Sequence, residues 1–325
     1  MDNLNVVAVT VTYNRINTLE KTILALSKQA KFLDKIIVVD NNSDSEHKNR
    51  LKEIEVENSM VEVLWMNNNL GGSGGFYRGM KFALEKYNPK WYWIMDDDAY
   101  PIDNCLENLL KYENKLDDIG FLAPTIYGID NKEYQMYHHK MISKYKVNDI
   151  IAVEKFEDLN SVTEVEANAF VGPLFSREAI KAVGLPDEGL FIYGDDTEYT
   201  YRVSRKLKCY LIKEATINHQ DPPYQGKVVA PEGWWKEYYM FRNRYLFLDE
   251  FSESFIKNLV GKAYLTIHLG KRILGTLIKG HYKGFRSPRL NILIRAIRDG
   301  IRKRNGKTID PKEYIDFIKI IRNKN

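Results

Sequence analysis

The strongest constraint on the fold is an alternation, within residues 6–95, of apolar runs that suit buried strands with segments that suit helices. The runs are rich in β-branched or aromatic residues and are bounded by polar ones: Val6–Thr12, Ile36–Val39, Val61–Met66 and Trp91–Met95. We expect one helix over Leu19–Leu26, with Asn17 or Thr18 as its N-cap, and another over Phe76–Tyr87 after a loop at 67–75. This alternation predicts an α/β fold with a mostly parallel sheet flanked by helices.

Polar clusters follow the four apolar runs, each at the point where a run ends. They are Thr12–Arg15, Asp40–Asp44, Asn67–Gly75 and Asp96–Asp98. Because ligands of open α/β sheets bind outside the carboxyl ends of the strands, we expect the four clusters to converge on one binding site.

Two phosphate-binding motifs fail to match the glycine-rich stretch. A G-x-G-x-x-G pattern that starts at Gly72 meets Tyr77 where its third glycine belongs. Gly74 and Gly79 have the glycine spacing of a P-loop, but Met80 stands in place of its lysine. The sequence therefore supports neither a nicotinamide dehydrogenase nor a P-loop NTPase.

Composition bounds the class of protein. Hydrophobic residues make up 44% and charged residues 28% of the chain, which predicts a soluble protein with a sizeable core. Cys105 and Cys209 are too few for a disulfide scaffold and lack the spacing of a zinc site, so we expect a reducing compartment. The N-terminal segment lacks a signal-peptide pattern, and no apolar run is long enough to span a bilayer. We therefore expect a cytoplasmic globular protein.

Asp96, Asp97 and Asp98 stand together at the end of a predicted strand. Alternate side chains of an extended segment point the same way, so Asp96 and Asp98 can direct two carboxylates at one divalent cation. Hard oxygen ligands suit Mg²⁺ or Mn²⁺, which commonly take phosphates as further ligands. The alternative is a solvated acidic turn, but three adjacent negative charges repel one another without a counter-cation.

A second acidic cluster, Asp195-Asp196-Thr197-Glu198, opens a segment that we expect to be helical. A carboxylate there can act as general base toward a hydroxyl if its pKa is raised, and we favour Asp196 over Asp195. Helix capping is the ordinary alternative. His219 stands in a polar segment after the apolar run Cys209–Ile212 and is a candidate third metal ligand, although a lone histidine is more often structural.

The segment 234–245 mixes aromatic residues, among them Trp234 and Trp235, with Arg242 and Arg244. Such a segment can stack a sugar or hold phosphate. An aromatic core helix is the competing interpretation.

The C-terminal part of the chain is basic. From residue 251 onward it carries 18 Lys+Arg and 5 Asp+Glu, whereas the residues before it carry 30 basic and 39 acidic side chains. Apolar residues recur there at helical spacing in two runs, 259–277 and 290–301, interleaved with lysine and arginine. Basic amphipathic helices suit an anionic membrane surface. Packing on the body or on a sister subunit is the alternative, and nucleic acid is disfavoured because no motif for it occurs.

In combination, these motifs resemble family-2 glycosyltransferases with the GT-A fold, over residues 5–250. The segments that carry the resemblance are VTVTYNR (9–15), IIVVDNNSD (36–44), NNNLGGSGGF (67–76), WIMDDDA (93–99), LFIYGDDTEYTYR (190–202) and NHQD (218–221). The glycine-rich and DDTEY segments look like the galactofuranosyltransferase and rhamnosyltransferase branch that builds bacterial surface polysaccharides. The resemblance implies a nucleotide-sugar transferase domain at 1–250 and a basic helical tail at 251–325.

The resemblance also implies roles for individual residues. Asp96, Asp98 and His219 would bind Mn²⁺ or Mg²⁺, and Asp196, beside Asp195, would be the base. The nucleotide and the donor sugar would lie along a set of residues drawn from the polar clusters: Thr12, Arg15, Asp40, Asn69, Gly71, Gly72 and Asp97. Asn41 replaces the aspartate of the commoner VVDDGS form and supplies no charge for recognition of the base.

The implied activity is inverting, metal-dependent transfer of a sugar to a hydroxyl of a glycan or a lipid-linked oligosaccharide. The donor we favour is UDP-galactofuranose, with dTDP-rhamnose as the alternative, in the synthesis of O-antigen, capsule or cell wall. Alternatives of another class are a nucleotidyltransferase and a non-catalytic nucleotide-sugar-binding protein. The basic tail fits peripheral attachment to the inner face of the cell membrane, or a homo-oligomer.

Overall fold

A computed structural model describes residues 5–130, 132–143, 148–220 and 229–324. The chain forms two compact units. The first comprises the described residues within 1–142, 149–188 and 195–223, and the second those within 143–148, 189–194 and 224–325.

The first unit is built on a nine-stranded sheet. Its strands are β1 (Val6–Thr12), β2 (Lys35–Asp40), β3 (Val61–Trp65), β4 (Trp91–Asp96), β5 (Ala99–Pro101), β6 (Ile119–Gly128), β9 (Val162–Glu164), β11 (Val171–Ser176) and β12 (Lys208–His219). Their order is β3-β2-β1-β4-β11-β6-β12-β5, and β9 pairs with β12. Strands β1 to β4 run parallel, as do β6 and β12, whereas β11 runs antiparallel to β4 and β6. The expectation of a mostly parallel sheet is confirmed.

A smaller antiparallel sheet accompanies the first. It contains β10 (Ala167–Asn168), β7 (His139–Ile142) and β8 (Asp149–Ile151), and β7 follows directly on the short 3₁₀ helix η1 (Met136–His138).

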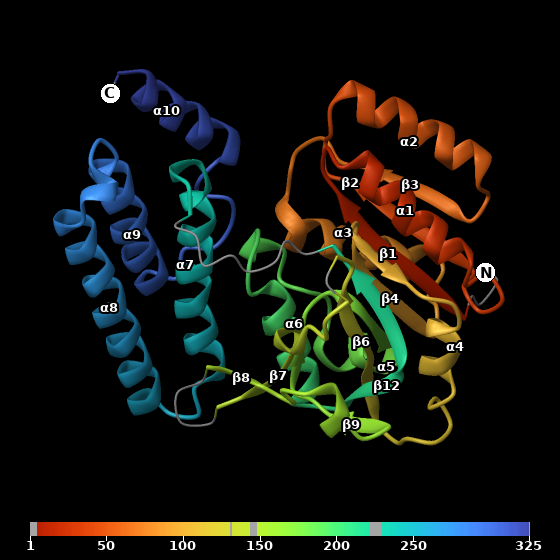
Figure 1. Ribbon diagram of the computed structural model, residues 1–325. Coiled ribbons are helices and arrows are strands. Elements are labelled where there is room, and N and C mark those ends of the chain that lie inside the picture. Colours follow the sequence, from red (N-terminus) through yellow and green to blue (C-terminus); the bar gives the residue numbers. More distant parts are fainter. Residues whose placement is uncertain (1–4, 131, 144–147, 221–228, 325) are drawn as a thin grey trace. The chain divides into compact units, whose positions relative to one another are not determined.

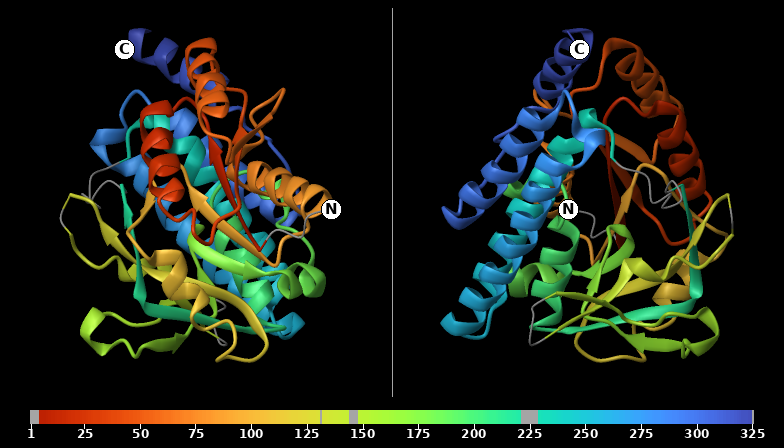
Figure 2. Two further views of the ribbon diagram at one scale, coloured as in Figure 1. Left: turned by 90° about the vertical axis from the view of Figure 1, so that its right-hand side faces the viewer. Right: turned by 60° about the vertical axis from the view of Figure 1, so that its left-hand side comes forward.

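Helices cover both faces of the large sheet (Figures 1 and 2). One face carries α1 (Ile16–Ser27), α2 (Ser45–Glu57) and α4 (Cys105–Leu110), and the other carries α3 (Gly71–Lys86), α5 (Arg177–Val183) and α6 (Asp195–Ser204). Successive residues of β1 alternate between the two cores, with Val6 and Ala8 on one face and Val7 and Val9 on the other. Burial on both faces explains why β1, β2 and β4 are nearly continuous apolar runs.

The helix boundaries differ from the predicted ones at two places. Helix α1 begins at Ile16, so Asn17 and Thr18 lie inside the helix and neither is its N-cap. Part of the predicted loop at 67–75 is helical, because α3 begins at Gly71. Its glycines permit close packing on β1: a Cβ on Gly75 would lie 2.4 Å from Val11 Cγ1.

The second unit is helical. Its helices are α7 (Trp234–Phe251), α8 (Phe255–Ile278), α9 (Arg286–Ile301) and α10 (Pro311–Lys324). Helix α7, which the sequence analysis placed in the first domain, belongs to this unit because its aromatic side chains share a core with α9. No helix in the described ranges is long and apolar enough to cross a bilayer.

Candidate active site

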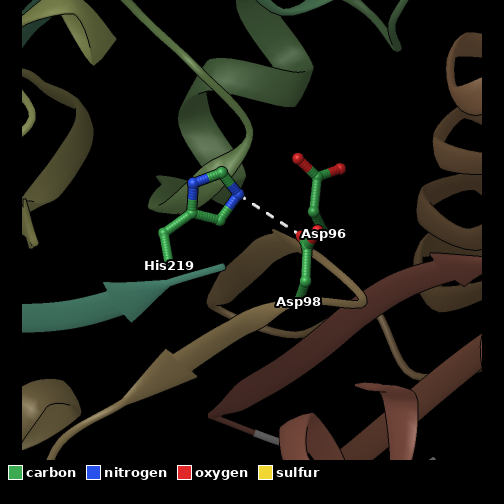
Figure 3. A group of neighbouring side chains, drawn as sticks. All are labelled: Asp96, Asp98 and His219. Atoms are coloured by element: carbon green, nitrogen blue, oxygen red, sulfur yellow. Dashed lines mark ion pairs between the residues drawn. The ribbon is translucent and has the colours of Figure 1, made fainter. Parts of the chain in front are cut away.

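Three predicted metal ligands converge in the first unit (Figure 3). Asp96 ends β4, and Asp98 lies in the turn between β4 and β5. His219 ends β12, where it pairs with Ala99 of β5, and this pairing brings the imidazole to the acidic turn. One ligand atom from each residue lies within 4.8 Å of the others, and His219 Nε2 is 3.3 Å from Asp98 Oδ1. Asp98 reaches this position through a turn and not through the alternation of an extended strand that we expected.

The electrostatics of the triad favour a bound cation. Burial raises the pKa of Asp96 well above its ordinary value, and the charges of Asp98 and Asp97 add to the effect. Burial acts in the same direction on Asp98, but its hydrogen bond to His219 and the charges of His219 and Arg15 outweigh burial and lower its pKa. Two carboxylates and an imidazole form a donor set that fits Mn²⁺, and a dication relieves the repulsion between the carboxylates.

Arg15 already supplies part of the positive charge that the aspartates need. Its Nη1 donates to Asp97 Oδ1 at 2.8 Å, and its Nη2 donates to Asp98 Oδ2 at 2.5 Å. Asp97 Oδ2 accepts a hydrogen bond of 2.8 Å from Thr12 Oγ1, and burial raises the pKa of Asp97 to about 6. Thr12, Arg15 and Asp97 therefore lie together, in line with the expected convergence of the polar clusters. Thr12 and Asp97 are buried and hydrogen-bond to each other, and their contacts with the donor stay a prediction. Arg15 keeps a half-exposed side chain that can reach a phosphate.

His219 is oriented by a residue that the sequence analysis missed. Gln135 Oε1 lies 3.4 Å from His219 Nδ1 and 3.0 Å from His138 Nε2. An amide oxygen only accepts hydrogen bonds, so this contact favours a proton on His219 Nδ1. Nε2, which faces Asp98, would then be the nitrogen that gives up its proton and offers its lone pair to a bound cation. Gln135 lies in the connection after β6, and no motif or spacing in the sequence singles it out.

Asn41 links the end of β2 to the start of α3, and Asp40 and Asn69 make local hydrogen bonds beside it. Asp40 is fully buried at the end of β2 and accepts from the Ser43 amide. Asn41 Nδ2 donates to the Gly71 carbonyl at 2.7 Å, and Asn69 Oδ1 accepts from the Gly71 amide at 2.8 Å. An aspartate at position 41 has no N–H for the bond to Gly71, which gives a structural reason for the departure from the VVDDGS form.

The second acidic pair lies in the first turn of α6, close to the start of α3. A Cβ on Gly72 would lie 3.7 Å from Asp195 Oδ2. Burial, followed by the charge of Asp196, raises the pKa of Asp195 to about 8. The charges of both residues also contribute to the raised pKa of Asp96, so the two acidic clusters interact.

Trp234 and Trp235, the two tryptophans that we expected to stack a sugar, belong to the second unit. Trp234 is buried, with its ring near those of Tyr282 and Phe285, so it packs in a helical core. Trp235 is half-buried on the same helix. Arg242 is fully buried and donates to backbone carbonyls, which is a structural role. Asp221, the last residue of the NHQD segment, lies outside the described residues.

Comparison with known proteins supports a glycosyltransferase. Galactofuranosyltransferase GlfT1 of Mycobacterium tuberculosis (strain ATCC 25618 / H37Rv) is 28% identical over 253 residues, which cover 74% of this chain and 81% of the relative. The dTDP-rhamnosyl transferase RfbF of Shigella flexneri is 25% identical over 254 residues, which cover 76% of this chain and 80% of the relative.

Among solved structures, GalNAc-T7 with UDP, GalNAc and Mn²⁺ has a TM-score of 0.55 at 20% identity. The match covers 75% of this chain and 51% of that structure, so this chain spans about half of its length. It supports the GT-A fold that the resemblance implied. The protein-family model described as glycosyl transferase family 2 matches residues 7–183, which is more than half of the sequence. The chain therefore belongs to glycosyltransferase family 2.

Proposed function

We propose that this glycosyltransferase is an inverting, metal-dependent enzyme that moves galactofuranose from UDP-galactofuranose to an acceptor hydroxyl. The acceptor is a glycan or a lipid-linked oligosaccharide in the synthesis of a bacterial surface polysaccharide. The observation that carries the proposal is the convergence of Asp96, Asp98 and His219 beside the acidic pair Asp195 and Asp196. Family membership favours this activity over a nucleotidyltransferase or a non-catalytic binding protein.

Asp96, Asp98 and His219 would hold Mn²⁺ or Mg²⁺, and the imidazole favours Mn²⁺. When bound, the cation neutralises negative charge that develops on the departing diphosphate. The similar structure of GalNAc-T7 contains UDP and Mn²⁺. Arg15, held beside the same carboxylates, would add a second positive group toward the phosphates.

Asp196 would act as the general base. Its carboxylate takes the proton of the acceptor hydroxyl as the oxygen forms a bond to the anomeric carbon, on the face opposite the nucleotide. The bond between that carbon and the phosphate oxygen breaks, and its electron pair leaves with the diphosphate. Burial and the charge of Asp196 raise the pKa of Asp195, so Asp195 would hold the proton when the pair shares one, and this leaves Asp196 as the carboxylate that we favour for the base.

The remaining predicted contacts would line the donor: Thr12, Asp40, Asn69, Gly71, Gly72 and Asp97. The buried Asp40 and the ordered start of α3 support a preformed nucleotide site. Trp235, half-buried on α7, stays a prediction for sugar stacking, whereas the burial of Trp234 favours a packing role.

Titration calorimetry with UDP and with dTDP, each in Mn²⁺ and in EDTA, tests this proposal. Metal-dependent preference for UDP supports a galactofuranose donor, in line with the similarity to GlfT1. Preference for dTDP moves the donor to rhamnose, the second candidate, which the similarity to RfbF supports. Binding of neither nucleotide would overturn the assignment of the site.

We also propose that the protein is a cytoplasmic, peripheral protein on the inner face of the cell membrane, where a lipid-linked acceptor would be found. The basic C-terminal helices support this placement. A homo-oligomer through the same helices is the alternative.

A further inference from the structure

Helix α8 carries an exposed apolar stripe along its whole length. By the helical period its members fall within an arc of about 100°, on a helix about 36 Å long. Each is between 48% and 79% exposed: Ile256, Leu259, Val260, Ile267, Leu274, Leu277 and Ile278. Single exposed apolar residues are ordinary, but a continuous stripe of this size marks an interaction surface.

The opposite side of α8 holds the helix in the second unit. Leu269 and Thr276 are buried, and Leu265 and Ile273 pack against the core that α7 and α9 share. Figures 1 and 2 show α8 beside these two helices. A Cβ on Gly261 would lie 2.8 Å from Leu248 Cδ2, which shows how closely α8 approaches α7. The stripe is therefore not needed to attach α8, and substitutions in it leave this packing intact.

The charges around the stripe have one sign. No aspartate or glutamate occurs between residues 255 and 298. Lys262 and Arg272 pair with Asp249 and Glu237 on α7. In the described ranges, by contrast, no carboxylate pairs with four exposed cations at and beyond the C-terminal half of α8: Lys271, Lys279, Lys283 and Arg286.

We propose that α8 lies flat on an anionic lipid bilayer, with its apolar stripe in the interface and the four exposed cations at the phosphates of the lipid headgroups. Amphipathic helices of this composition bind membranes through buried apolar area and attraction to anionic lipid. This inference rests on the peripheral placement proposed above and narrows it to one helix. Helix α9, the second amphipathic run of the sequence, directs Ile292, Leu293 and Ala296 into the protein core.

Charge complementarity decides between a bilayer and a second copy of the chain. Two α8 stripes placed face to face would bring the lysines and arginines of the two copies together. These positive charges would repel one another, because α8 has no carboxylate to pair with them. A layer of anionic headgroups supplies the opposite charge over the full length of the helix.

Flotation of the full chain with vesicles tests the proposal. We expect binding to vesicles of equimolar phosphatidylcholine and phosphatidylglycerol, and weak binding to phosphatidylcholine alone. The double variant Ile267→Glu/Leu274→Glu should lose more than about tenfold in partitioning, because two apolar contacts with the bilayer are removed. The triple variant Lys271→Glu/Lys279→Glu/Lys283→Glu should lose the preference for anionic vesicles.

The matched control is Leu24→Glu/Val56→Glu, which places two glutamates at exposed apolar positions of α1 and α2 and should float as the wild type does. Wild-type flotation by either α8 variant, or no flotation of the wild type, would overturn the proposal. A dimer that Ile267→Glu/Leu274→Glu dissociates, without lipid binding, would assign the stripe to a second copy. UDP binding measured on the same samples reports separately on the transferase site, so either proposal can fail without the other.

Discussion

Arg15 donates to Asp98 Oδ2 at 2.5 Å, so one of the two expected metal-binding carboxylates is already paired with a cation of the protein. The guanidinium is about half exposed, which makes the pair breakable. We therefore expect Arg15 and a divalent metal to compete for Asp98 until a bound diphosphate offers the arginine another partner.

Replacing Arg15 by alanine should consequently have opposite effects on metal and nucleotide. We expect Arg15→Ala to bind Mn²⁺ about threefold to tenfold more tightly without nucleotide, as expected for loss of a partly exposed ion pair. Affinity for UDP in the presence of Mn²⁺ should fall. Calorimetry measures both constants, and weaker Mn²⁺ binding by the variant would show that Arg15 supports the metal site instead of competing with it.

Asp196→Asn should leave UDP binding unchanged and cut sugar transfer by roughly 10²- to 10⁴-fold, the usual contribution of a general base. The reason is that an amide cannot take the acceptor proton. The assay follows product formation with the donor that the calorimetry selects. Near-normal turnover would remove Asp196 from this role, and the same assay on Asp195→Asn would then identify the base.

Asp98→Ala should weaken UDP binding when Mn²⁺ is present and have no comparable effect in EDTA, because the carboxylate acts on the nucleotide through the metal. Asp103→Ala removes an exposed aspartate beyond β5 and serves as the matched control. If the wild-type protein binds UDP equally with and without chelator, the assignment of Asp96, Asp98 and His219 as a metal site is wrong.

Gln135→Leu should reduce Mn²⁺ affinity by about tenfold or more, the usual effect of losing a group that orients a histidine ligand. Gln135→Glu keeps an oxygen acceptor for His219 Nδ1 and should retain Mn²⁺ binding. Calorimetry with Mn²⁺ alone reads this out without reference to turnover. Equal losses in both variants would indicate a general disturbance of the loop and not a loss of orientation.

The raised pKa of Asp195 should make stability depend on pH in EDTA. Its pKa is about 8 when folded and near 3.8 ordinarily, so folding favours the protonated form. The stabilisation is fully present below the ordinary pKa and is lost as the pH rises through about 8. Melting temperature should therefore fall less steeply over that range in Asp195→Asn than in the wild type. Parallel curves would show that Asp195 titrates normally in the folded protein.

Much of this site follows from local residue patterns. The strands β1, β2 and β4 are nearly continuous apolar runs because both of their faces are buried, and such runs are visible without knowledge of their partners. The acidic turn after β4 could be placed at the site because an apolar strand stops there at three aspartates, and ligands bind beyond the carboxyl ends of such strands. The loop expected at 67–75 was partly wrong, because α3 begins at Gly71. Glycine permits either a turn or close packing of a helix, so the glycines after Asn69 did not distinguish the two.

Other features depended on contacts between distant segments. His219 and Gln135 come into contact because β12 pairs with both β5 and β6. These strands are far apart in the sequence, and no local residue pattern indicates which of them will pair. Helices α8 and α9 have similar amphipathic patterns, yet α9 buries Ile292, Leu293 and Ala296 in the core, whereas α8 exposes its stripe. Periodicity shows that a helix has an apolar face, but which partner covers that face depends on the packing of the whole unit.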